Sequence, residues 1–230
     1  MSELKRYSLI KDKFKREFIL LQGKGCAFKQ CKFCDYYQDV SADPFKVNKP
    51  VIDKITGETG VIDIINSGSC LELDDKSIKL IQKKVNDLKI HTIWFEAHWM
   101  YRDKLSEFRS LFKNSKVKFR VGVETFDPEF RVSLNKGIPK NVKPADISEY
   151  FDGVCLLIGL KGQTKEMIKN DIDIARKYFE YFSVNVFSEN STNMKRDEEL
   201  INWFKLNLLD ELKNDPKAEV LINNTDLGVG

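Results

Sequence analysis

Three of the five cysteines in this 230-residue chain lie within nine residues of one another: Cys26, Cys31 and Cys34. They form a C-x4-C-x2-C pattern in the stretch "GKGCAFKQCKFCDYY", and no fourth cysteine is nearby. A structural zinc site takes four ligands, so three thiols indicate a metal centre that keeps one position open. Without a metal, three clustered thiols would invite oxidation with no gain in packing.

Three kinds of metal centre are compatible with these cysteines. Zinc could be held by three thiolates and a water, although His91 is expected at the opposite edge of the sheet and only His98 follows the same strand. A [2Fe–2S] cluster could add Cys70 as a distant fourth ligand, but such clusters belong to small β-rich folds. A [4Fe–4S] cluster held by three cysteines would leave one iron open for a small molecule. The third kind explains the missing fourth ligand, and the sequence favours it.

The elements that position these cysteines alternate between two types. Short apolar runs, typical of strands buried on both faces, are followed by longer segments with helical spacing. This alternation predicts βα units, a parallel sheet and an α/β fold, in a single domain covering residues 1–230. The predicted strands are 18–22, 61–66, 92–96, 119–124, 154–159 and 182–187; the predicted helices are 74–89, 102–114, 164–182 and 195–213. Residues 216–230 are expected to form a closing segment with a last short strand.

Polar or small residues stand where each predicted strand ends. Glu96 and Glu124 directly close two of the apolar runs, and the cysteines follow the first run. In parallel α/β folds ligands bind at the carboxyl edge of the sheet. We therefore expect a binding site at this edge, with the cysteines on one of its loops.

Composition narrows the classes of partner. The chain has 38 basic and 35 acidic residues, a net charge of +3, which is too small to indicate direct nucleic-acid binding. No apolar run is long enough to span a bilayer, and the charged start "MSELKRYSLIKDKFKREF" has no apolar signal region, so we expect a cytoplasmic protein without membrane contact. The basic residues that crowd segment 1–16 predict a solvated, flexible lead-in; the alternative is a patch for an acidic electron donor.

The pattern as a whole resembles the radical S-adenosylmethionine (SAM) superfamily, from about Phe18 to Asn190. The usual motif of that superfamily is C-x3-C-x-Φ-C after the first strand, and Phe33 occupies the aromatic position Φ. This chain has one extra residue between Cys26 and Cys31. The resemblance implies an α/β fold of the partial (β/α)6 TIM-like barrel type. It also implies a [4Fe–4S] cluster on the three cysteines and SAM on the open iron.

Further segments in the matching order carry the resemblance and imply SAM-binding residues. The turn "NSGS" is similar to the Gly-rich turn that holds the methionine amino group, and "VGVET" is similar to the segment whose acidic residue reaches SAM. "LLIGLKGQT" is similar to the segment beside the adenine, and the arginine in "DPEFRVSLNKGI" is a candidate partner for the SAM carboxylate. These residues are Ser67, Gly68, Ser69, Glu124, Arg131, Ile158 and Leu160.

A closer resemblance within the superfamily lies in "ILLQGKGCAFKQCKFCDYYQDVS", "INSGSCLELDD" and "WFEAHWMYRD". It is to lyases that release 7-aminomethyl-7-deazaguanine from queuine by breaking the carbon–nitrogen bond to its cyclopentene-diol group. This implies a queuine-like base as substrate and a flavodoxin- or ferredoxin-type electron donor. Carboxylates such as Asp226 and Glu96 are expected to read the N–H edge of the base. The full set of candidate substrate contacts is Glu96, His98, Asn185, Asn190, Asn223 and Asp226.

Two other functions stay open from the sequence. One is a radical SAM enzyme that modifies tRNA or a protein, which the low net charge counts against. The other is a non-catalytic iron–sulfur or zinc protein.

Overall fold

A computed structural model of the chain describes residues 4–230, and the first three residues of the basic lead-in lie outside the described residues. The chain divides into two compact units. The first unit comprises the residues up to Lys29, residues 36–119 and the C-terminal residues 224–230; the second comprises residues 30–35 and 120–223. The single domain expected over 1–230 stays a prediction, and each unit is described by itself.

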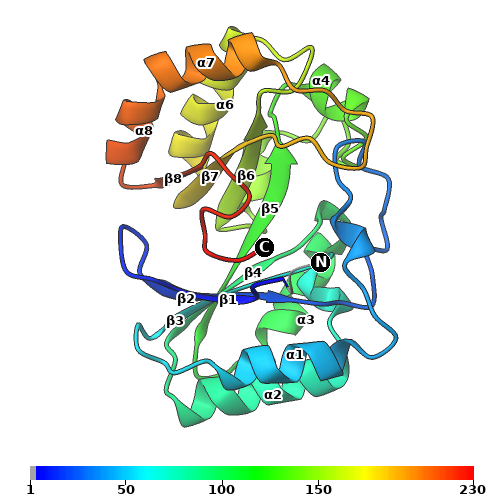
Figure 1. Ribbon diagram of the computed structural model, residues 1–230, viewed down its shortest axis with the longest axis vertical. Coiled ribbons are helices and arrows are strands. Elements are labelled where there is room, and N and C mark those ends of the chain that lie inside the picture. Colours follow the sequence, from blue (N-terminus) through cyan, green and yellow to red (C-terminus); the bar gives the residue numbers. More distant parts are fainter. Residues whose placement is uncertain (1–3) are drawn as a thin grey trace. The chain divides into compact units, whose positions relative to one another are not determined.

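In the first unit, helices α1 and α2 lie against strands that run side by side in chain order (Figure 1). Strand β1 pairs with β2 in the antiparallel sense, whereas β2, β3 and β4 are parallel. The first residues of β5 also belong to this unit. The elements, with η marking 3₁₀ helices, are β1 (Tyr7–Ile10), β2 (Arg16–Leu21), η1 (Tyr36–Gln38), α1 (Pro44–Asp53), β3 (Val61–Asn66), η2 (Cys70–Glu72), α2 (Asp75–Asp87), β4 (Thr92–Glu96), η3 (Trp99–Lys104), α3 (Leu105–Arg109) and β5 (Lys116–Glu124).

The second unit repeats the strand–helix alternation. The end of β5 pairs with β6, β6 with β7 and β7 with β8, all in parallel. Every residue of β6 is buried, which is what a strand covered on both faces requires. The elements that follow β5 are α4 (Pro128–Ser133), α5 (Pro144–Ser148), β6 (Gly153–Ile158), α6 (Lys165–Tyr178), β7 (Tyr181–Val186), α7 (Glu198–Asn207), α8 (Leu209–Asn214) and β8 (Ala218–Leu221).

The α/β alternation and all six predicted parallel strands are confirmed, with β8 as the predicted last short strand. The prediction of a flexible lead-in is wrong for residues 7–10, which form β1 and add an edge to β2. The prediction of one helix over 195–213 is also wrong, because the segment is divided into α7 and α8 at Leu208. Helix α1 was not predicted, although Asp43 caps it and Pro44 starts it.

None of the helices in the described part of the chain is long and apolar enough to cross a membrane.

Candidate functional site

The three cysteines of the motif lie on the loop that follows β2, and each is partly exposed to solvent. Lys29, between the first two, has a left-handed backbone conformation (φ 51°), and its N–H lies 3.3 Å from the Cys26 sulfur. A positive φ is uncommon for a residue other than glycine, so the loop bends at Lys29, within the longer gap of the motif. Cys26 belongs to the first unit, whereas Cys31 and Cys34 belong to the second.

The first unit ties the predicted methionine-binding turn to the start of the cysteine loop and to His98. The Ser67 hydroxyl accepts the N–H of Gly23 at 3.1 Å. The Ser69 hydroxyl accepts the N–H of His98 at 2.9 Å. The His98 ring also stacks on Phe28 of the cysteine loop, with ring centroids 4.3 Å apart. Three segments that are distant in sequence thus meet at the carboxyl ends of β2, β3 and β4.

Glu72, which the sequence did not single out, lies at the centre of this group. Its Oε1 accepts the N–H of Ala27 at 2.7 Å and the hydroxyl of Tyr101 at 3.0 Å, while its Oε2 accepts the N–H of Ser69 at 2.6 Å. Its backbone carbonyl accepts the N–H of Lys24 at 2.8 Å. Burial, followed by the bond to Glu72, raises the pKa of Tyr101 to about 12, so Tyr101 is a hydrogen-bond donor at neutral pH.

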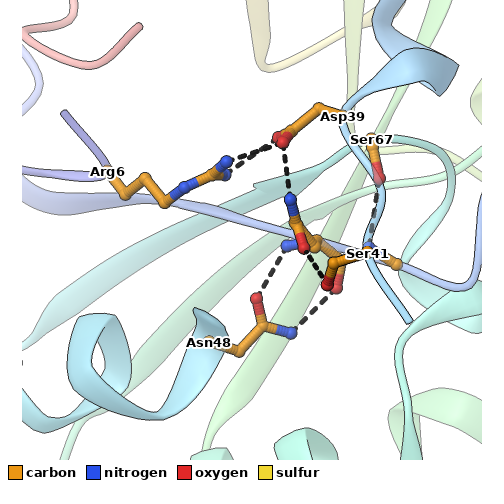
Figure 2. Close-up of polar contacts among 7 residues, drawn as sticks. Arg6, Asp39, Ser41, Asn48 and Ser67 are labelled. Atoms are coloured by element: carbon orange, nitrogen blue, oxygen red, sulfur yellow. Dashed lines mark hydrogen bonds and ion pairs between the residues drawn. The ribbon is translucent and has the colours of Figure 1, made fainter. Parts of the chain in front are cut away.

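A second polar group holds the segment that follows the cysteines, and Figure 2 shows its contacts. Arg6 donates two hydrogen bonds to the Asp39 carboxylate, at 2.6 and 2.9 Å, and Gln22 Nε2 donates to the same carboxylate at 2.7 Å. Gln22 Oε1 accepts the Ser41 hydroxyl, and the Gln22 backbone exchanges two hydrogen bonds with the Asn48 side chain. Gln22 immediately precedes the cysteine loop, so one residue joins the loop's two ends within the first unit.

In the second unit, Phe33 packs in a buried apolar cluster with Leu160, Leu134, Leu157 and Phe187. Cys31 and Cys34 pack against this cluster, so Leu160 of the predicted adenine segment lies beside the second and third cysteines. The neighbouring residue of that segment, Ile158 at the end of β6, is also buried.

Asn190 holds the same part of the loop. Its Nδ2 donates to the carbonyl of Phe33 at 2.8 Å, and its Oδ1 accepts from Thr192. The structure therefore uses the amide of this predicted substrate contact to anchor the cysteine loop.

Glu124 occupies the end of β5 in a backbone conformation (φ 68°) that is rare outside glycine. The pairing of β5 with β6 shifts register between Gly122 and Glu124, and such a bulge turns a side chain toward a new direction. The Glu124 carboxylate is buried and forms an ion pair with Lys136 at 2.7 Å. The Lys136 ammonium also lies 5.5 Å from the centre of the Phe33 ring. Lys136 thus contacts both Glu124, the carboxylate predicted to reach SAM, and Phe33, the aromatic position of the motif. No motif in the sequence singles out Lys136.

Arg131, the candidate partner for the SAM carboxylate, is only 1% exposed. Its Nη2 lies 3.3 and 3.4 Å from the carbonyl oxygens of Pro139 and Val142. Burial lowers its pKa, which the nearby carboxylates of Asp171 and Asp127 partly oppose. These contacts give Arg131 a role in holding the loop after α4.

Two buried asparagine oxygens lack a hydrogen-bond partner among the described residues: Asn66 Oδ1, beside the turn Ser67–Ser69, and Asn185 Oδ1 on β7. A buried acceptor without a partner is costly, so each is suited to a donor on a ligand. Three further candidate substrate contacts differ in exposure. Glu96 is half-buried at the end of β4, and Asn223 and Asp226 are exposed near the C-terminus.

The three loop cysteines and Cys70 differ in burial. Among the described residues, no group of three or more His, Cys, Asp or Glu side chains is placed to hold a metal ion, the loop cysteines included. Cys70, the candidate fourth ligand of a [2Fe–2S] cluster, is fully buried, and burial raises the pKa of its thiol well above the usual range. The three loop cysteines remain accessible, and soft thiolates are the ligands that iron–sulfur clusters take.

Comparison with solved structures gives a relative that matches the chain over its full length. No family model and no curated protein matches the chain. Among solved structures, the chain is similar to queuine lyase from Clostridium spiroforme bound to SAM and queuine, with a TM-score of 0.95 and 44% sequence identity. The match covers 99% of this chain and 100% of that one. The expected fold class, the partial (β/α)6 TIM-like barrel, is confirmed by this match.

Proposed function

The chain belongs to the queuine lyase family of radical SAM enzymes, and from this we propose that it cleaves queuine to 7-aminomethyl-7-deazaguanine. The observation that carries the proposal is the full-length similarity, at 44% identity, to a lyase that was solved with both SAM and queuine bound. The bond broken is the carbon–nitrogen bond between the aminomethyl group and the cyclopentene-diol.

The residues that would hold the cofactors are present in this chain. Cys26, Cys31 and Cys34 are proposed to bind a [4Fe–4S] cluster, with Phe33 packed beneath the loop. When bound, the cluster supplies the electron for reductive cleavage of SAM, which yields a 5′-deoxyadenosyl radical. The protein's own part is to orient the cofactors and the base and to exclude water.

For SAM, the unpartnered Asn66 oxygen beside the turn Ser67–Ser69 supports the assignment of this turn to the methionine amino group. Glu124 stays proposed as a second acceptor for that amino group. Arg131 stays proposed for the methionine carboxylate, and we add Lys136, the ion-pair partner of Glu124, as a second candidate cation. Ile158 and Leu160 stay proposed beside the adenine, where their buried side chains would exclude water.

For the substrate, the best-supported residue is Asn185, whose buried Oδ1 is suited to an N–H of the deazaguanine. The other proposed contacts stay His98, Glu96, Asn190, Asn223 and Asp226. Modification of tRNA or of a protein has no comparable support, because the relative at 44% identity binds queuine itself.

We propose that the electron comes from a flavodoxin- or ferredoxin-type protein in the cytoplasm. Both kinds of donor carry a low-potential one-electron centre, which the cluster requires.

The proposed function is tested by anaerobic reconstitution with iron, sulfide and a reductant, followed by addition of SAM and queuine. The expected products are 5′-deoxyadenosine and 7-aminomethyl-7-deazaguanine, measured by liquid chromatography with mass detection. Cys34→Ala serves as the control and should form neither product. A reconstituted protein that contains the cluster but leaves queuine intact would overturn the proposal.

A further inference from the structure

The Glu72 carboxylate receives hydrogen bonds from three segments of the first unit. Ala27 is the residue after Cys26, Ser69 ends the methionine-binding turn, and Tyr101 lies in η3. Glu72 is 7% exposed, so water has little access to the carboxylate to replace these hydrogen bonds.

The donors decide which side chain this position can accept. A backbone N–H can only donate, and each Glu72 oxygen faces one: Ala27 faces Oε1 and Ser69 faces Oε2. A glutamine in the same place must turn its NH₂ group toward one of the two N–H groups, whichever way its amide is oriented. Only a carboxylate satisfies both donors, and its charge strengthens both bonds.

The space around Glu72 is equally restrictive. A Cβ at Gly68 would lie 2.0 Å from Glu72 Oε2 and 3.1 Å from the Cα of Cys26. The turn therefore needs glycine to admit the Glu72 carboxylate next to the backbone of the first cysteine. Gly68 therefore lies close to both the Glu72 carboxylate and the backbone of Cys26.

We propose that Glu72 is a positioning residue that fixes the backbone beside Cys26 to the turn Ser67–Ser69. This inference rests on the proposed function, in which Cys26 binds the cluster and the turn binds SAM. Loss of the carboxylate then loosens two things together: the hold of the loop on the cluster, and the alignment of SAM against it.

The test compares Glu72→Gln with Tyr101→Phe in reconstituted protein. The first readout is the rate at which a chelator bleaches the visible absorbance of the cluster. Glu72→Gln should lose the cluster about tenfold faster than wild type, since breaking one charge-assisted bond costs enough for such a factor. Tyr101→Phe should change the rate little, because both backbone donors keep their acceptors.

The second readout is the change that SAM produces in the electron paramagnetic resonance spectrum of the reduced cluster. Glu72→Gln should weaken this change at a given SAM concentration, which a merely structural role would not do. Should Glu72→Gln fail to fold, Glu72→Asp replaces it; the shorter carboxylate cannot reach both donors and should also lose the cluster faster than Tyr101→Phe.

Equal rates for Glu72→Gln and wild type, or for Glu72→Gln and Tyr101→Phe, would overturn the positioning role. The chelation rate is measured without queuine, so the positioning role of Glu72 and the lyase activity are tested independently. Wild-type protein that spares queuine while the variants keep the expected order refutes the lyase activity alone.

Discussion

Asp171, on α6, is a buried carboxyl group with one satisfied and one unsatisfied oxygen. Oδ1 accepts the N–H of Phe126 at 2.6 Å, whereas Oδ2 has no partner among the described residues. Burial, only partly offset by hydrogen bonds from Phe126 and Thr125, raises its pKa from 3.8 to about 7. The folded protein therefore holds this proton more tightly than the unfolded chain.

The consequence is a pH-dependent free energy of unfolding. Because the pKa is raised on folding, Asp171 favours the folded state below its ordinary pKa, and that contribution is lost as pH rises toward 7. Asp171→Asn keeps an acceptor for Phe126 and cannot ionise. We expect the variant to gain stability relative to wild type between pH 5 and pH 8, by roughly 1–3 kcal/mol. Urea unfolding of both proteins at the two pH values checks this, and parallel curves would contradict it.

The polar group of Figure 2 connects the ends of three elements, β1, β2 and η1. Arg6, immediately before β1, and Gln22, just after β2, converge on Asp39, which follows η1. Although burial alone would raise it, the bonds from Arg6 and Gln22 lower the pKa of Asp39. The carboxylate's contribution to stability is thus present above the ordinary pKa and lost as pH falls through the lowered one.

Asp39→Asn should loosen the segment that carries η1. We expect a loss of about 1–2 kcal/mol at pH 7, because charge-assisted bonds from Arg6 are weakened, and a smaller difference from wild type near pH 3. Hydrogen exchange at residues 39–41 should rise in the variant. The exposed pair Lys49–Asp53 provides a matched control, since Asp53→Asn should change neither measurement appreciably.

The elements were predictable where local pattern decides them. Short runs rich in β-branched and aromatic residues predicted the bounds of β3 and β4 to the residue, and apolar spacing with Asp74 as the cap predicted α2. Strand β1 was missed because four residues between charges become a strand only by pairing with β2. Helix α1 was missed because Pro50 lies inside it, which local propensity disfavours.

The site was predictable to the extent that its residues stand in contiguous motifs. The cysteines, the turn Ser67–Ser69 and Glu124 each occur in a recognisable string. Glu72, Lys136 and Asp39 do not, because their roles arise from segments between 12 and 45 residues apart that meet only in the folded chain.

At the scale of the whole molecule, the C-terminal residues 224–230 belong to the first unit although β8 belongs to the second. Gly230 donates its N–H to the carbonyl of Lys5 at 2.8 Å, and Val229 is 5% exposed. The end of the chain is therefore hydrogen-bonded to the residues just before β1, and Figure 1 shows the C-terminal segment in red.

Truncation after Asn223 should destabilise the first unit in particular. Burying one valine and one backbone bond contributes roughly 2–3 kcal/mol, which would be lost. We expect faster hydrogen exchange in β1 and little change in α6, measured by mass spectrometry on the two segments. Uniform acceleration across both would contradict the assignment of the tail to the first unit.

The left-handed residue at Lys29 also bears on how such chains are found. Lys29 lies between Cys26 and Cys31, so the longer gap of this motif contains a bend of the backbone. The gap length is then an unreliable signature, and a text pattern that demands three intervening residues would discard this chain. A search pattern that allows a variable gap between the first two cysteines, and that also requires an acidic residue such as Glu72 soon after β3, would retain this chain.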